Sequence, residues 1–197
     1  SPYSTAGCSI IGCHESPRTP MSKIAKFTAT AEPLGDAVPF VGRIREIIEA
    51  IHLFEDFEPG DLEVLARYMQ CYRVPVGTEI IAESEPGDFM LLILSGGVEI
   101  VKNDVRGLPQ RIATAGPGKT LGEMSLIDGE PRFASCVTLG EVEFAVLDRA
   151  ALSRLIAEKP KVGVKLMMEL LILLNQRLRN VSAQLMDCME ARRTRIR

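Results

Sequence analysis

Ten glycines divide residues 72–147 of this chain into pieces of strand length, and this spacing constrains the fold more than any other feature. The pieces between them are rich in β-branched and large apolar residues, as in Phe89–Leu94, Val98–Lys102 and Val142–Leu147. Turn signals about every 8–12 residues are typical of an all-β sandwich or barrel. We therefore predict a jelly-roll (double-stranded β-helix) barrel of about eight strands. The glycines are Gly77, Gly87, Gly96, Gly97, Gly107, Gly116, Gly118, Gly122, Gly129 and Gly140.

Helical periodicity appears on both sides of this region. Apolar residues recur at helical spacing from Val41 to Ile51, and a second short amphipathic segment covers Leu62–Met69. After the barrel, Asp148 is a good N-cap for a short helix. Pro160 then begins a much longer helix that is predicted to run to about Arg192. The expected fold class is mainly β with flanking helices.

The long helix carries a narrow apolar seam in which residues alternate by steps of three and four. Such a seam, with polar residues at most other positions, favours a partner helix and predicts a parallel homodimer. A helix that packs on its own barrel is the alternative. The seam residues are Leu171, Leu174, Leu178, Val181, Leu185 and Cys188.

Four regions follow from these patterns. Residues 1–38 show no periodicity and are predicted to be a flexible tail, in which Met21 is a candidate natural start. Residues 39–160 form the barrel domain, 161–192 the coiled-coil-like helix, and 193–197 a basic tail.

Composition excludes several classes of function. The net charge of −3 and the pI of about 5.5 give no general attraction to nucleic acid or anionic membrane, and no apolar run is long enough to span a bilayer. Five scattered cysteines indicate a reduced, cytoplasmic setting. With two histidines, and no fourth ligand for Cys8, Cys13 and His14, we predict no metal site, no catalytic residues and no enzyme activity.

The segment Leu121–Val137 carries the chemistry. A helical turn that opens at Gly122 exposes backbone N–H groups to an anion, and Arg132 offers a fork of donors to the same anion. Glu123 beside them fits a ligand that also has hydroxyl groups, so phosphate and hydroxyl together indicate a nucleotide. From spacing alone, a structural salt bridge between Glu123 and Arg132 is an equally good interpretation.

A resemblance to a known family decides between a nucleotide site and a structural salt bridge. Gly122-Glu123-x-Ser125-Leu126 followed by Pro131-Arg132-x-Ala134-Ser135 resembles the phosphate-binding cassette of the cyclic nucleotide-binding domain family. Upstream segments are also similar to that family: Phe54-x-x-Phe57, Val76-Gly77-Thr78-x-Ile80, Pro86-Gly87-Asp88-x-Met90 and Ser95–Ile100. The resemblance spans roughly residues 40–185.

The resemblance implies cAMP or cGMP as ligand, with a cyclic dinucleotide left open, and no separate cofactor. Glu123 should accept from the ribose 2′-hydroxyl, and Arg132 should bind an exocyclic phosphate oxygen. Residue 182 on the long helix is expected near the base. The implied binding residues are Gly122, Glu123, Met124, Ser125, Arg132, Phe133, Ala134, Ser135 and Ser182.

Two residues depart from the family pattern. Phe133 replaces a small residue after the arginine, which puts the pocket shape in question, and Ser84 replaces a glycine.

Three functions compete at this point. A sensor that binds a cyclic nucleotide and signals through the long helix is favoured by the presence of both Glu123 and Arg132. A degenerate dimerisation or interaction module and a truncated transcription regulator of the catabolite activator type are the alternatives. Few residues follow the seam, so DNA binding by this chain is not expected.

Overall fold

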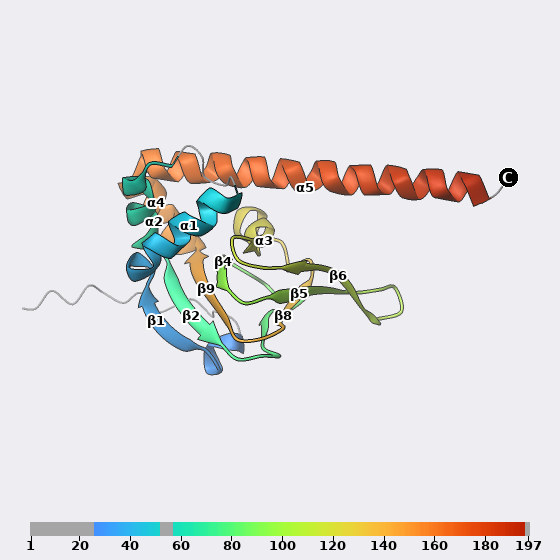
Figure 1. Ribbon diagram of the computed structural model, residues 1–197, viewed down its shortest axis with the longest axis horizontal. Helices are drawn as coiled ribbons and strands as arrows, with labels where there is room; N and C mark the ends of the chain where they lie inside the picture. Colours follow the sequence, from blue (N-terminus) through green and yellow to red (C-terminus); the bar gives the residue numbers. More distant parts are fainter. Residues whose placement is uncertain (1–25, 52–56, 196–197) are drawn as a thin grey trace, which may run out of the picture.

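A computed structural model of the chain describes residues 26–51 and 57–195. It contains two antiparallel sheets that close into a barrel, with helices against the outer face of one sheet and a long helix that runs past the barrel (Figure 1). The predicted fold class is thus confirmed. In the described ranges, none of the helices combines the length and apolar character that a bilayer crossing needs.

The larger sheet has the strand order β1-β2-β9-β4-β7, and the smaller sheet has the order β3-β8-β5-β6. Eight strands, β2 to β9, lie between Gln70 and Asp148, close to the predicted barrel region. The strands are β1 Glu32–Asp36, β2 Gln70–Val74, β3 Glu79–Ile81, β4 Phe89–Ser95, β5 Val98–Asn103, β6 Pro109–Ala115, β7 Thr120–Leu121, β8 Ser135–Thr138 and β9 Val142–Asp148.

Residues alternate between the two faces of the larger sheet, because successive side chains of a strand point to opposite sides. Along β4, Phe89, Leu91 and Ile93 face the barrel interior, where they pack with residues such as Val98 and Cys136 of the smaller sheet. Met90, Leu92 and Leu94 face outward and pack against the helices. The helices therefore share one apolar core with the sheet that carries the functional site.

Helices α1, α4 and α5 begin where the sequence predicts, whereas α2 covers Pro59–Ala66 and not Leu62–Met69. The Asp148 carboxylate accepts from the Ala151 N–H at 2.7 Å and caps α4, and Pro160 begins α5. The helices are η1 Lys26–Ala29, η2 Val38–Phe40, α1 Val41–Ile51, α2 Pro59–Ala66, α3 Glu123–Asp128, α4 Arg149–Glu158 and α5 Pro160–Arg195.

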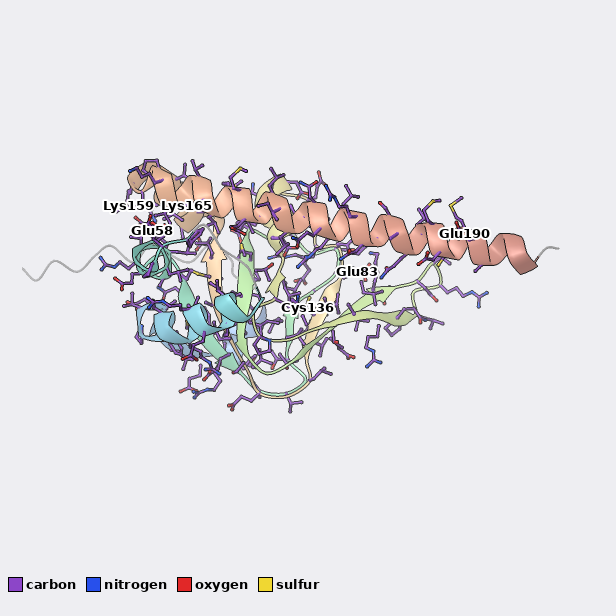
Figure 2. All side chains as sticks on the ribbon, turned by 45° about the horizontal axis from the view of Figure 1, so that its top comes forward. Glu58, Glu83, Cys136, Lys159, Lys165 and Glu190 are labelled. Carbon is purple, nitrogen blue, oxygen red and sulfur yellow. The ribbon has the colours of Figure 1, made fainter. Side chains whose placement is uncertain are left out.

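Helix α5 is held to the body of the domain over its first half. Lys165 forms an ion pair with Asp61 of α2 at 2.6 Å. At Gly163 an added Cβ would lie 2.9 Å from the Cα of Ile156, so only glycine allows α4 and α5 to approach this closely. The distal half, which includes Glu190, projects past the barrel (Figures 1 and 2).

The N-terminal segment is the main difference from the sequence prediction. Residues 1–38 were predicted to be a tail, but from Lys26 onward they form η1, β1 and η2, and β1 pairs with β2 as a ninth strand. Strand β1 has no buried residues, and its pairing is irregular between Pro33 and Gly35, so its sequence shows no alternation that would mark it as a strand.

Several predictions lie outside the described residues. These are the tail from residue 1 to residue 25 with Cys8, Cys13 and His14, the motif residue Phe54, and residues 196–197 of the basic tail.

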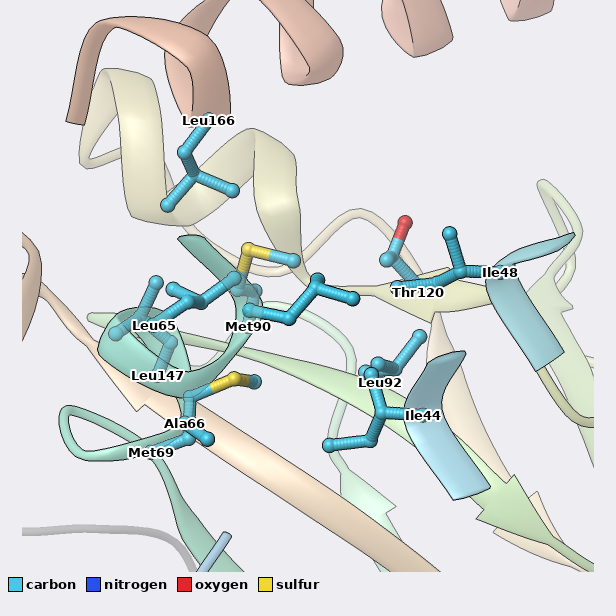
Figure 3. A pocket seen from close by; sticks show the side chains of 11 residues that line it. Ile44, Ile48, Leu65, Ala66, Met69, Met90, Leu92, Thr120, Leu147 and Leu166 are labelled. Atoms are coloured by element: carbon cyan, nitrogen blue, oxygen red, sulfur yellow. The ribbon is translucent and has the colours of Figure 1, made fainter. Parts of the chain in front are cut away.

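A small cavity of about 20 Å³ lies where α1, α2 and α5 meet the larger sheet (Figure 3). Its wall is apolar except for Thr120 of β7. Within the described residues the Thr120 hydroxyl has no hydrogen-bond partner, although the residue is only 1% exposed. A buried hydroxyl without a partner lowers stability, because its water contacts are lost and not replaced.

We expect Thr120→Val to raise the free energy of unfolding by about 1–2 kcal/mol, since valine keeps the shape and removes the hydroxyl. Urea denaturation measures the change. Thr120→Ser is the matched control: it keeps the hydroxyl, loses a methyl group and should be less stable than wild type. A loss of stability in the valine variant would mean that the hydroxyl has a partner, such as a buried water.

Candidate functional site

The turn from β7 into α3 begins the site. Gly122 lies between Leu121, which pairs with Leu91 of β4, and the first residue of α3. It has a φ of +81°, and an added Cβ would lie 2.4 Å from Nη1 of Arg132. Both the left-handed backbone and the lack of space therefore require glycine here.

Arg132 is the central residue of the site and is only 4% exposed. Its Nη1 donates to the Gly122 carbonyl at 2.9 Å, and its guanidinium carbon lies 4.3 Å from the centre of the Phe89 ring. An added Cβ at Gly87 would lie 1.9 Å from Nε of Arg132, so that glycine makes room for the guanidinium. Burial lowers the pKa of Arg132 from its ordinary value.

The backbone of Arg132 is fixed from the loop after β3. Its N–H donates to the Glu85 carbonyl at 2.9 Å, and its carbonyl accepts from the Ser84 N–H at 2.8 Å. Ser84 adopts a φ of +64°, a left-handed conformation that glycine takes at lower cost. This explains why a glycine is expected at position 84 and shows that serine keeps the same turn.

Glu123 begins α3 and is 1% exposed. Its Oε1 accepts from Nη1 of Arg177 on α5, and Nη2 of the same arginine donates to the Thr120 carbonyl at 2.8 Å. Burial raises the pKa of Glu123, while the charges of Arg177 and Arg132 act in the opposite direction. The ion pair of Glu123 is thus with Arg177, not with Arg132 as the structural interpretation of the motif supposed.

Two polar atoms in the site have no hydrogen-bond partner among the described residues: Oε2 of Glu123 and Nη2 of Arg132. Both residues line one pocket of about 100 Å³, which therefore has a buried acceptor and a buried cationic donor in its wall. Buried polar groups are nearly always satisfied in native proteins, and these two are therefore the best indication of a ligand.

The structure brings together most of the residues predicted from the motif. Gly122, Glu123, Met124, Ser125, Arg132, Phe133 and Ala134 line the pocket with Ile81, Ile100, Leu121, Cys136 and Arg177.

Two predicted residues lie differently. The Ser135 hydroxyl accepts from the Glu83 N–H at 2.9 Å and so supports the loop before the site. Ser182 lies on the exposed distal part of α5, and its proximity to a base stays a prediction. The pocket residue contributed by α5 is instead Arg177, which the sequence analysis did not single out. Its place in the sequence next to the seam residue Leu178 is the feature from which its role could have been predicted.

Phe133 is at the rim of the pocket, with its side chain turned to Lys102. The Lys102 ammonium lies 4.4 Å from the centre of the ring and donates to the Phe133 carbonyl at 2.7 Å. The residue is 56% exposed, so the bulky ring does not fill the pocket.

Comparisons with known proteins agree with this geometry. The family model of the cyclic nucleotide-binding domain matches residues 72–159. A CRP-like cAMP-activated global transcriptional regulator from Mycobacterium tuberculosis is 34% identical over 142 residues, which is 72% of this chain and 62% of the regulator. The chain therefore spans less than two thirds of that relative's length.

Solved structures show the same similarity. A cyclic nucleotide-binding domain from Methylobacillus flagellatus superposes with a TM-score of 0.74 at 42% identity, covering 79% of this chain and 88% of that one. The catabolite activator protein of Thermus thermophilus superposes with a TM-score of 0.60 at 31% identity, covering 67% of this chain and 60% of that one.

Proposed function

The chain belongs to the cyclic nucleotide-binding domain family, and from this premise we propose that it is a sensor domain that binds cAMP or cGMP and signals through α5. The observation that carries the proposal is the pair of unpartnered atoms in the pocket, Nη2 of Arg132 and Oε2 of Glu123. A ligand that satisfies both must present an anionic oxygen and a hydroxyl donor together. A 3′,5′-cyclic nucleotide does so with its phosphate and its ribose 2′-hydroxyl.

A ligand that is only an anion fits the site less well. The Glu123 carboxylate would repel it, and Oε2 would remain without a partner. In the proposed complex Arg132 binds an exocyclic phosphate oxygen, and Glu123 accepts from the ribose. Gly122 and Ala134 contribute backbone atoms, while Met124, Ser125 and Phe133 form the rest of the sugar and phosphate end.

Arg132→Leu should weaken cyclic nucleotide binding by about ten- to a hundredfold, because a charge-assisted hydrogen bond contributes roughly 1.5–3 kcal/mol and about 1.4 kcal/mol is tenfold in affinity. Glu123→Gln should cost less, since the amide oxygen still accepts. Isothermal titration with cAMP, cGMP and a cyclic dinucleotide, on protein freed of carried-over nucleotide, measures both effects.

Arg111→Leu, at an exposed position on β6, is the matched control and should bind like wild type. If Arg132→Leu retains full affinity, or if wild type binds none of the ligands, the sensor proposal is wrong. A degenerate dimerisation or interaction module then becomes the better interpretation.

Signalling through α5 is supported by the contact between Arg177 and Glu123. The same carboxylate is proposed to accept from the ribose, so ligand and α5 both act on Glu123. Because Arg177 is the residue through which α5 lines the described pocket, it is the proposed transmitter.

Hydrogen exchange along Leu171–Met189 should therefore slow when ligand binds. Arg177→Gln should reduce this response, whereas Arg179→Gln, at an exposed neighbouring position, should leave it intact. If nucleotide does not change the exchange rates of wild type, α5 does not respond to the ligand and the signalling proposal is wrong.

A homodimer through the α5 seam is part of the proposal. Leu171, Leu178, Val181 and Leu185 are 53%, 65%, 62% and 60% exposed, so these residues do not pack on the barrel of their own chain, and Leu174 is half-buried. Apolar residues exposed at a/d spacing favour a second α5 as partner.

Leu178→Asp places a charge in the middle of this seam and should convert the dimer to monomer. Gln184→Asp, exposed and off the seam, adds the same charge and should leave the dimer intact. Light scattering over a concentration series distinguishes them, and a monomeric wild type at high concentration would contradict the seam interpretation.

The proposed cellular setting is a reducing one. Cys71 and Cys136 are buried free thiols, and burial raises the pKa of each to about 12, which keeps them unreactive. A cytoplasmic location stays a prediction.

A further inference from the structure

Four aromatic side chains meet in the barrel interior, and one of them comes from outside the region matched by the family model. Phe27 belongs to η1, whereas the family match begins at residue 72. Its ring centre lies 5.7 Å from Tyr72, 5.9 Å from Phe89 and 5.4 Å from Phe144, each in an edge-to-face arrangement. At 1% exposed, Phe27 is as deeply buried as the barrel's own core.

This aromatic cluster contacts Arg132 through Phe89. Phe89 is the first residue of β4 that faces the barrel interior, and its ring lies under the Arg132 guanidinium at 4.3 Å. The ring is 3% exposed and the guanidinium residue 4%, so solvent does not weaken the attraction between the cation and the aromatic face. Phe89 thus contacts the cation without being one of the residues that line the pocket.

Phe27 in turn fixes the Phe89 ring. The Phe27 carbonyl accepts from the N–H groups of Thr30 and Ala31 and from the Thr30 hydroxyl, at 2.9–3.1 Å. These bonds hold the backbone of η1, so the Phe27 side chain has a fixed position in its edge-to-face contact with the Phe89 ring. Without it, a space would open beside Phe89 and the ring would no longer be held at one angle to Arg132.

We propose that Phe27, acting through Phe89, is a positioning residue for Arg132, so that the segment before the family domain helps to set the affinity for the ligand's phosphate group. The ligand part of this inference rests on the proposed function. The positioning part rests on the aromatic cluster alone and is testable without ligand.

The test uses two substitutions that keep apolar bulk and remove the ring, Phe89→Leu and Phe27→Leu. In Phe89→Leu we expect cAMP affinity to fall about 3- to 30-fold, as the loss of a buried cation–π contact implies, and in Phe27→Leu about 2- to 10-fold. Leu65→Ala is the control, because it removes buried volume from the core on the other face of the larger sheet. It should lower the unfolding temperature and leave affinity unchanged.

A spectroscopic readout separates positioning from general loss of stability. In the unliganded protein the ring current of Phe89 should displace the Arg132 Nε–Hε resonance, which is assigned by its loss in Arg132→Lys. Phe89→Leu should remove that displacement, Phe27→Leu should reduce it, and Leu65→Ala should leave it in place.

The outcomes for ligand and for positioning are distinct. If wild type binds no cyclic nucleotide but the resonance behaves as expected, the proposed function fails and the positioning role stands. If Phe27→Leu keeps both the wild-type resonance and the wild-type affinity, the inference is overturned, whatever the ligand.

Discussion

A buried guanidinium is the constraint on which the rest of this site depends. Removing a charged group from water is costly unless other groups compensate for the lost hydration. For Arg132 the compensation includes the Gly122 carbonyl, the face of the Phe89 ring and the negative charges of Asp88 and Glu123. Nη2 has no hydrogen-bond partner among the described residues and is the atom proposed to bind the ligand. Gly87 and Gly122 leave the space that the guanidinium occupies, and the loop after β3 holds the Arg132 backbone. These features keep the cation buried in one position.

Local sequence signals predicted the parts of the fold that depend on local physics. Asp148 and Pro160 mark helix starts because capping and a fixed φ act within one turn, and the glycine spacing gave the barrel because turns are local. The cassette motif likewise brought Gly122, Glu123 and Arg132 together correctly, because these residues are close in sequence and share one pocket.

The features that sequence reasoning missed depend on contacts between distant segments. Arg177 reaches Glu123 across 54 positions, and Phe27 packs against Phe89 from a stretch with no periodicity. Strand β1 pairs with β2 although none of its residues is fully buried, and its one core contact is that of the half-buried Leu34, so it has no apolar alternation. A single buried aromatic residue produces no hydrophobic periodicity in its segment. A prediction from periodicity therefore assigns the segment to a tail.

In the proposed sensor, the placement of Arg177 beside Leu178 would link the small pocket to the apolar seam of α5. Consecutive residues of a helix point about 100° apart, so one turn of α5 presents Arg177 to the pocket and Leu178 to the outside. Because a helix is stiff along its axis, a rotation or tilt that moves Arg177 relative to Glu123 would also move the apolar seam. The tight contact at Gly163 and the ion pair of Lys165 with Asp61 hold the near end of α5, so such a movement grows toward the projecting distal half. In the proposed sensor, a change at the Glu123 carboxylate would thereby reach the exposed distal half of α5.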